Sequence, residues 1–358
     1  MTMPRHNADN LRIKRKYLVW LKEAKGFSEA SIDKAAAAIS TYDRYLEGKD
    51  FRAFHPERAR AYKRHLGRQK NERTGAPLSP TTIGSTLREV KSFFGWLADQ
   101  PGYKSKITHA DVAYLTPDRR AENARRSNLW KPHPSPEQAR RVVRAMPSEK
   151  TVQRRDRAFI AFLFLTGSRV AAAISLRLGH IDLDHACVTF DGRVVDTKFA
   201  KSFTTAFFPI GDEVEQIVRE WITELRQEYC WSHADPLFPK TRIGVGASRR
   251  FEALGIAREP WTNPSSVARI FKTAFEDTGL PPFSPHRVRD TLVELSNDHC
   301  RTPEDYKAWS QNLGHEDVLT TFRSYGSVAP GRQVELMARF RDRGTGSSED
   351  DFSVLEDD

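Results

Sequence analysis

Residues 158–169 read AFIAFLFLTGSR, and this stretch decides how the second half of the chain folds. Its first eight residues are apolar without a break, so we expect them in a buried helix over 155–166. Gly167 should end that helix, because glycine is the residue that most often terminates one. Ser168 is then a candidate N-cap for the next helix, which we predict over 169–178.

Downstream of these two helices lies a convincing β-stretch. The segments HACVTF (185–190) and RVVDTK (193–198) flank Asp191-Gly192, a dipeptide typical of a two-residue hairpin turn. KSFTTAFFPI (201–210) is predicted as a third strand. The rest of the second half has helical patterning, so the expected fold class is mainly α with a small antiparallel β-sheet, an α+β chain.

The first third of the chain is predicted to be helical throughout. Residues 31–45 carry apolar side chains at helical spacing, and Ser79-Pro80 is typical of an N-cap followed by the first residue of a helix. Basic residues recur on the polar faces of these helices: Arg58, Arg60, Lys63, Arg64, Arg88 and Lys91. We expect them to face DNA, with an ordinary solvated surface as the alternative.

The charge distribution supports a polyanionic partner. The chain has a net charge of +10, and residues 1–135 hold 27 basic and 14 acidic residues. The last ten residues, in contrast, hold six acidic residues and no basic one. A strongly basic first third favours nucleic acid as the partner. A basic soluble protein without such a partner is the alternative reading of the charge alone.

Composition also predicts four segments. We expect a helical, DNA-binding domain over 1–116, a basic, proline-rich linker over 117–136, a second domain over 137–343 and an acidic, disordered tail over 344–358. Arg125 and Arg126 in the linker would contact a phosphate backbone, unless the linker is simply solvated.

Several classes of protein are excluded. The longest apolar run, Ala158–Leu165, is far shorter than the roughly 20 residues that span a membrane, and the N-terminal residues lack the apolar stretch of a secretory signal. The three cysteines are scattered, and no CxxC or HExxH spacing occurs. We therefore expect no metal site and no disulfide framework, and a reducing cytoplasm as the location.

Four short segments of the second half carry basic, hydroxyl and imidazole side chains. They are TGSR at 166–169, TKFAK at 197–201, SPHRVR at 284–289, and LGH at 313–315, the last followed by Thr320-Thr321 and Tyr325. Ser284 is a candidate cap and Pro285 a candidate first residue of a helix. Such a helix would place His286 and Arg289 three residues apart on one face.

In this order and spacing, the segments resemble the tyrosine recombinases, the phage-integrase family of site-specific DNA recombinases. The residues on the family's catalytic positions are Arg169, Lys198, His286, Arg289, His315 and Tyr325. The resemblance covers residues 137–340 and extends more weakly to 15–115, which looks like the family's helical core-binding domain. It implies that domain followed by a tyrosine-recombinase catalytic domain.

The resemblance implies that the chain cuts and rejoins duplex DNA through a covalent 3′-phosphotyrosine, without metal, ATP or another cofactor. Arg169 and Arg289 would clamp the non-bridging phosphate oxygens, because guanidinium groups bind such oxygens in pairs and stay charged. Tyr325 would attack the phosphorus. His315 would hydrogen-bond the phosphate.

The reaction also needs a base and an acid. A phenol with an ordinary pKa of about 10 needs help to lose its proton, and His286 is the candidate general base or orienting group. The 5′-oxygen leaves poorly unless it is protonated, and Lys198 in a turn is the candidate general acid. Lys201, three residues further on, is the alternative candidate for the general acid. If Lys198 has that role, we expect Lys201 to contact DNA.

The chain departs from the family pattern at one supporting position. The family usually has an acidic residue three positions after its first arginine, where this chain has Ala172. Asp290, directly after the second arginine, is a candidate substitute. The loss of that acid leaves a non-catalytic DNA-binding relative open as a reading. DNA relaxation like that of the type IB topoisomerases, which uses the same residue set in a monomer, is a further alternative.

The family also suggests partners. Residues 333–341 carry Val334, Met337 and Phe340 on one face. In the family such a segment packs onto a neighbouring protomer and closes a ring of four; packing on its own domain is the alternative. We expect specific double-stranded DNA sites and a homo-tetramer on DNA, with accessory DNA-binding proteins as further partners, in the cytoplasm at the nucleoid.

Overall fold

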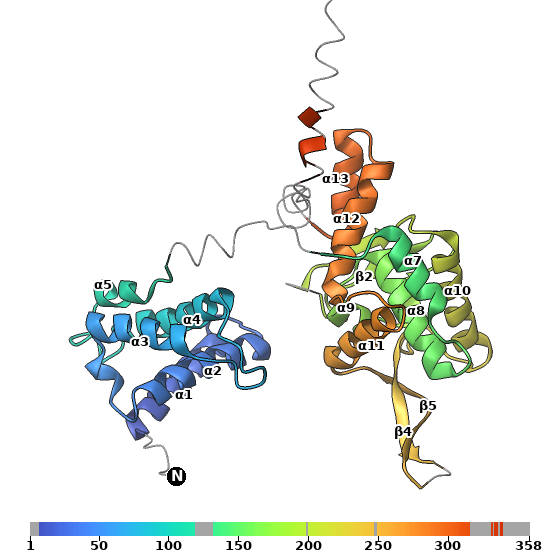
Figure 1. Ribbon diagram of the computed structural model, residues 1–358. Helices are drawn as coiled ribbons and strands as arrows, with labels where there is room; N and C mark the ends of the chain where they lie inside the picture. Colours follow the sequence, from blue (N-terminus) through green and yellow to red (C-terminus); the bar gives the residue numbers. More distant parts are fainter. Residues whose placement is uncertain are drawn as a thin grey trace, which may run out of the picture. The chain divides into compact units, whose positions relative to one another are not determined.

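The computed structural model describes residues 7–118, 132–197, 200–246, 249–315, 331, 333–335 and 337–338. The chain divides into two compact units, Met1–Asn128 and Leu129–Asp358. Both units are built mainly from helices, and the second also holds two small antiparallel sheets (Figure 1). This confirms the predicted fold class. Within the described ranges, no helix has the length and apolar character needed to cross a bilayer.

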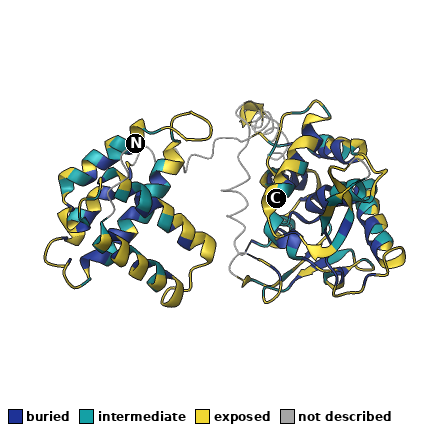
Figure 2. Cartoon of the chain, turned by 90° about the horizontal axis from the view of Figure 1, so that it is seen from below, coloured by how far each residue is buried: buried dark blue, intermediate teal, exposed yellow. Residues whose placement is uncertain are grey.

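The first unit is a helical domain around an aromatic core. Its elements are α1 (Ala8–Glu23), α2 (Glu29–Tyr45), η1 (Phe51–Ala53), α3 (Pro56–Arg68), α4 (Pro80–Ala98), α5 (His109–Val112) and η2 (Ala113–Leu115). The ring of Tyr42 on α2 lies edge-on to Tyr62 of α3 and Phe94 of α4, at centroid distances of 4.7 and 5.1 Å. Buried side chains therefore line the facing sides of these helices, and exposed ones line their backs (Figure 2).

The predicted start of α4 is confirmed. The Ser79 hydroxyl accepts a hydrogen bond from the Thr82 backbone N–H at 3.1 Å, and Pro80 is the first helical residue. The hydroxyl satisfies one of the N–H groups that a helix start leaves without a partner in the helix. Proline loses nothing at this position, because its missing N–H would have no partner in the helix either.

The second unit is built around a buried helix. Its helices are α7 (Pro136–Ala145), α8 (Thr151–Thr166), α9 (Val170–Ser175), η3 (Leu178–His180), α10 (Asp212–Gln227), α11 (Pro264–Glu276), η5 (Pro285–Arg287), α12 (Val288–His299) and α13 (Pro303–Asn312). Every residue of α8 from Ala158 to Leu165 is at most 1% exposed, as its unbroken apolar run predicts. Gly167 ends the helix in the left-handed conformation, with φ +58°, which confirms the predicted break.

The helix after Gly167 differs from the prediction in its cap and its length. The N-cap residue of α9 is Arg169 rather than Ser168, and the helix ends at Ser175. The Ser168 hydroxyl is engaged elsewhere, because it accepts a hydrogen bond from the Thr166 hydroxyl at 3.0 Å. Arg169 therefore stands at the start of the helix, directly after the turn.

A three-stranded sheet of order β1-β2-β3 follows, formed by β1 (Ile181–Asp182), β2 (Cys187–Phe190) and β3 (Phe203–Ala206). Its register pairs Phe190 with Phe203, so the predicted hairpin turn at Asp191-Gly192 and the predicted strand over 193–198 are wrong. The Asp191 carboxylate binds the Arg193 side chain, and its carbonyl accepts from two following N–H groups. These local bonds fold the segment into a loop instead of a strand.

A second, two-stranded sheet was not predicted from the sequence; it is formed by β4 (Pro239–Val245) and β5 (Phe251–Pro260). It extends as a hairpin from the helices of the second unit (Figure 1). Most residues of β5 are exposed, so the strand does not bury a continuous face against the core. The hairpin is fixed at its base, where Nη1 of the buried Arg155 donates to the Pro239 carbonyl at 2.9 Å.

Candidate active site

The turn at Gly167 is the structural centre of the site. Its carbonyl accepts a hydrogen bond from Nη1 of Arg289 on α12, at 2.6 Å. A Cβ at this position would lie 2.7 Å from the side chain of Leu313 and 2.9 Å from that of Leu292. Glycine is therefore required twice, for its left-handed φ and for the close packing. The close packing brings the end of α8, helix α12 and the LGH turn together.

Arg289 lies in the first turn of α12 and is only 3% exposed. Besides the Gly167 carbonyl, its guanidinium binds two groups of the LGH turn. Nη2 donates to the Leu313 carbonyl at 2.5 Å and to Nε2 of His315 at 2.7 Å. Gly167 and His315, which lie 122 and 26 positions from Arg289 in the sequence, thus hold its guanidinium group in place.

Arg169 and Arg289 line the same small cavity. Its other lining residues are Thr166, Gly167, Ser168, Ala172, Phe190, Thr197, Phe203 and Leu313. Arg169 is half-buried, and its side chain makes no hydrogen bond or ion pair with any residue that the structure describes. Two guanidinium groups on one cavity, one fixed and one available, suit an anion with several oxygens, such as a phosphate.

His315 is a buried imidazole beside these arginines. Burial lowers its pKa to about 4, and the positive charges of Arg289 and Arg169 and nearby His286 act in the same direction. His286 is exposed and lies in the 3₁₀ turn that precedes α12. Four of the predicted residues are therefore brought together: two arginines and two histidines. The side chain of Ser284 does not form the predicted cap for the turn.

Two predicted catalytic residues, Lys198 and Tyr325, lie outside the described residues. Thr197, the neighbour of Lys198, lines the cavity with the two arginines. Its hydroxyl donates to the Lys201 carbonyl at 2.7 Å, so the two ends of this loop are tied to each other. Lys201 itself is half-buried.

The position that departs from the family pattern is also part of the cavity. Ala172 lines it and is 4% exposed, so an acidic side chain there would have pointed into the surroundings of Arg169. Asp290, the suggested substitute, is buried and accepts a hydrogen bond from Nη1 of Arg287 at 2.9 Å.

Asn312 is a site residue that the sequence analysis missed. Its side-chain amide donates to the Ala206 carbonyl at 2.9 Å and accepts from the Ala206 N–H at 2.8 Å. The Asn312 carbonyl accepts from the Thr205 hydroxyl at 3.0 Å. These three bonds join strand β3 to the residue that precedes the LGH turn. A lone asparagine at a helix end carries no sequence signal for this pairing.

The predicted DNA-contacting residues of the first unit lie on two helices, α3 and α4. Lys63 donates to the carbonyls of Tyr114 and Thr116, at 3.2 and 2.6 Å, and Lys91 donates to the Thr116 hydroxyl at 2.8 Å. These two lysines therefore hold the end of the first unit in place. Arg88, also on α4, is half-buried.

The arginines of α3 have different surroundings. Arg58 donates to the Ala53 carbonyl at 2.8 Å. Arg60 is paired with Glu57 and lies over the ring of Tyr114 at 4.6 Å. Arg64 is exposed. The linker arginines Arg125 and Arg126 lie outside the described residues.

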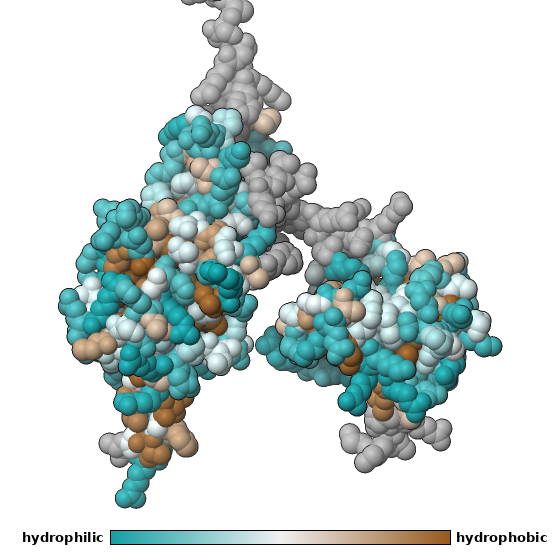
Figure 3. Space-filling model, turned by 180° about the vertical axis from the view of Figure 1, so that it is seen from behind, coloured by the Kyte–Doolittle hydropathy of each residue, from teal (hydrophilic) through white to brown (hydrophobic). Residues whose placement is uncertain are grey.

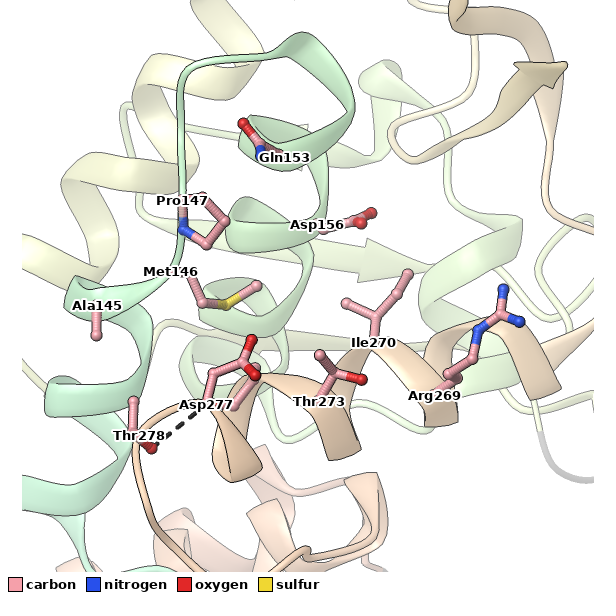
Figure 4. Close-up of a pocket in the computed structure, with 11 residues that line it drawn as sticks. Ala145, Met146, Pro147, Gln153, Asp156, Arg269, Ile270, Thr273, Asp277 and Thr278 are labelled. Carbon is pink, nitrogen blue, oxygen red and sulfur yellow. Dashed lines mark hydrogen bonds between the residues drawn. The ribbon is translucent and has the colours of Figure 1, made fainter. Parts of the chain in front are cut away.

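Another cavity of the second unit, of about 270 Å³, holds none of the predicted site residues (Figure 4). It lies between α7, α8 and α11 and is lined mainly by apolar surface, with Asp156, Asp277 and Arg269 among its residues. Across the described ranges, no group of three or more His, Cys, Asp or Glu side chains is placed to hold a metal ion.

Comparison with known proteins now places the chain in a family. The sequence pattern of the phage integrase family matches residues 135–332, more than half of the chain, and the chain belongs to that family. Tyrosine recombinase XerD of Neisseria meningitidis serogroup B is 27% identical over 186 residues, which are 52% of this chain and 55% of that protein. The chain thus spans about half the length of that relative.

Other similar proteins match over more of their length. Tyrosine recombinase XerD of Shewanella oneidensis is 24% identical over 327 residues, 90% of this chain and 94% of that protein. Two solved structures share the fold with a TM-score of 0.59 each. One is a lambda integrase dimer bound to a COC′ core site, 14% identical, covering 96% of this chain and 98% of that chain. The other is XerH recombinase bound to palindromic difH substrate, 15% identical, covering 95% and 91%.

Proposed function

We propose that this chain is a site-specific DNA recombinase that cuts and rejoins duplex DNA through a covalent 3′-phosphotyrosine, without metal or ATP. The observation that carries the proposal is the pair of guanidinium groups, Arg169 and Arg289, on one cavity. A phosphodiester gains negative charge on its non-bridging oxygens in the transition state, and preorganised cations stabilise that charge. Membership of the phage integrase family supports the same reaction.

Each remaining group has a role in this proposal. Tyr325 attacks the phosphorus and forms the phosphotyrosine, which conserves the energy of the broken bond. His286 accepts or orients the phenol proton, and Lys198 protonates the leaving 5′-oxygen, with Lys201 as the competing donor. His315, which accepts from Arg289 through Nε2 and lies beside both arginines, contacts the phosphate.

The proposed partner is duplex DNA that carries a specific site. The net charge of +13 over residues 1–135 supports phosphate contacts from the first unit and the linker. We propose a tetramer on two sites, because Val334 and Met337 are 70% and 49% exposed and form an apolar face for a neighbouring protomer. Accessory DNA-binding proteins and a location at the nucleoid in the cytoplasm belong to the same proposal.

A plasmid assay tests the proposal. The site is first identified as the sequence that the protein protects on genomic fragments, and two copies are placed on one supercoiled plasmid. Wild type should delete or invert the intervening segment without Mg²⁺ or ATP, and Tyr325→Phe should not. Relaxation of the plasmid without recombination, by a monomer, would indicate the topoisomerase-like reading. Binding without any cleavage would indicate a non-catalytic DNA-binding protein, the alternative suggested by the missing acidic residue at Ala172.

A further inference from the structure

The β4–β5 hairpin carries an apolar face near its tip. The register pairs Ile243 with Ala253 and Val245 with Phe251. Side chains two residues apart in a strand point to the same face, and paired residues share a face. Ile243, Val245, Phe251 and Ala253 therefore lie on one face of the hairpin, which we call the hairpin face.

The hairpin face is uncovered. Ile243 is 66% exposed, Val245 62% and Phe251 82%. In the space-filling view, hydrophobic atoms cover the hairpin just before its end, and the end itself is hydrophilic (Figure 3). Contiguous exposed apolar side chains of this kind mark interaction sites in soluble proteins. On the opposite face the Leu254 side chain, 44% exposed, lies over Gly244, where a Cβ would be only 2.6 Å from it.

Positive charge lies at the tip of the hairpin, beside the hairpin face. Arg249 and Arg250 at the tip make no ion pair with any residue in the described ranges, and Arg242 donates to the Leu254 carbonyl. At the base of the hairpin the cations are neutralised: Lys240 binds Glu259, and Arg258 binds Asp235. The partner of the tip must therefore supply both apolar and negatively charged groups.

The chain itself contains a segment of that chemistry. Residues 349–358 read EDDFSVLEDD and lie outside the described residues. Six carboxylates flank Phe352, Val354 and Leu355, and Phe352 and Val354 have the two-residue spacing that places side chains on one side of an extended chain. Duplex DNA would satisfy the arginines but not Phe251 or Ile243. A second hairpin would cover the apolar side chains but would bring like charges together.

We propose that residues 349–358 of this chain dock on the hairpin face, with Phe352 and Val354 against Val245 and Phe251 and the flanking carboxylates on Arg249 and Arg250. This site is separate from the Arg169–Arg289 cavity and does not depend on the recombinase proposal. Docking gives the acidic residues a specific position, and it covers the hairpin face, whose exposed apolar side chains would otherwise promote association between protein molecules.

Cysteine pairs in the full-length chain test the docking. In a Cys230→Ser background, which removes the exposed native thiol, Val245→Cys is combined with Val354→Cys. The matched control places the first cysteine at Glu252, next to the same residues but on the opposite face. The Val245 pair should form its disulfide about tenfold faster than the control, because docking raises the local concentration of the second thiol. Equal rates would overturn the proposal.

Charge reversal provides a second readout in the same assay. Arg249→Glu with Arg250→Glu should slow the Val245–Val354 disulfide to the rate of the control, and added Asp350→Arg and Asp351→Arg should restore it. Failure of the rescue contradicts the proposed ion pairs. Two further results would overturn the assignment. Disulfide-linked dimers of the Val245→Cys variant alone would show that a second hairpin occupies the hairpin face. Protection of that cysteine from a maleimide only when duplex DNA is added would show that DNA occupies it.

Discussion

Nη2 of Arg289 donates a hydrogen bond to Nε2 of His315 across 2.7 Å. An arginine has no acceptor, so the imidazole nitrogen must be the acceptor, and the ring is neutral with its proton on Nδ1. Burial and the neighbouring positive charges favour the same neutral form. The pair therefore fixes both the orientation of the guanidinium and the tautomer of the histidine.

The first prediction is that His315 stays neutral throughout the physiological pH range. Its pKa, lowered to about 4, should be visible in a nitrogen-15 NMR titration of the imidazole, with the proton on Nδ1 at pH 7. A His315 signal that titrates near 6.5, the ordinary value, would contradict the assignment.

The same pKa shift has a consequence for stability. Between about pH 6.5 and pH 4 the unfolded chain binds a proton at His315 that the folded chain does not bind. The stabilisation by the neutral histidine is therefore present above pH 6.5 and is lost as the pH falls toward 4. The free energy of unfolding of wild type, relative to His315→Gln, should fall from pH 7 to pH 5. A constant difference would refute this linkage.

A third prediction separates the two arginines. Arg289→Ala should lower both cleavage and stability, because it leaves buried carbonyls of Gly167 and Leu313 without a donor, at about 1–3 kcal/mol each. Arg169→Ala should lower cleavage about 100-fold or more and change stability by less than about 0.5 kcal/mol, since its side chain binds no described residue. Denaturant unfolding and single-turnover cleavage check both variants. Equal stability loss in both would show that Arg169 has a structural role.

A fourth prediction concerns the turn at Gly167. Gly167→Ala combines a left-handed φ of +58° with contacts below 3 Å to Leu313 and Leu292. Gly279, with φ +72° and open space around its Cβ position, is the matched control for the φ alone. We expect about 1 kcal/mol for Gly279→Ala and clearly more for Gly167→Ala in the unfolding free energy. Equal costs would mean that the close packing is unimportant.

A fifth prediction concerns DNA affinity. Arg64 on α3 is exposed, so Arg64→Ala should weaken binding and reduce the slope of log affinity against log salt by about 1, with unchanged stability. Lys63→Ala should also loosen the end of the first unit, because Lys63 holds the carbonyls of Tyr114 and Thr116. An unchanged slope for Arg64→Ala would show that α3 does not face the duplex.

Features that depend on residues close together in the sequence could be predicted in part. The buried helix and its end at Gly167 followed from an apolar run and a glycine, and both are confirmed. The turn at Asp191-Gly192 was wrong, because the Asp191 carboxylate binds Arg193 and the strand partner of Phe190 lies at Phe203. Ser168 was wrong as a cap, because its hydroxyl accepts from Thr166 instead.

Long-range contacts could not be predicted in the same way. The β4–β5 hairpin depends on backbone pairing and on the contact of Arg155 with Pro239, 84 residues away, and neither can be predicted from the residues of the strands alone. The family resemblance placed Arg169, Arg289 and His315 in one set, but the bonds of Arg289 to Gly167 and of Asn312 to Ala206 follow only from the tertiary packing.

The most direct test of the central claim is the covalent adduct. Wild-type protein is incubated with a duplex that carries the protected site and a nick beside the scissile phosphate, so that the cleaved strand diffuses away, and the denatured product is mapped by mass spectrometry. We expect a 3′-phosphate bonded to Tyr325, which is absent from Tyr325→Phe and strongly reduced in Arg169→Ala. An adduct on another residue, or an adduct that persists in Tyr325→Phe, would contradict it.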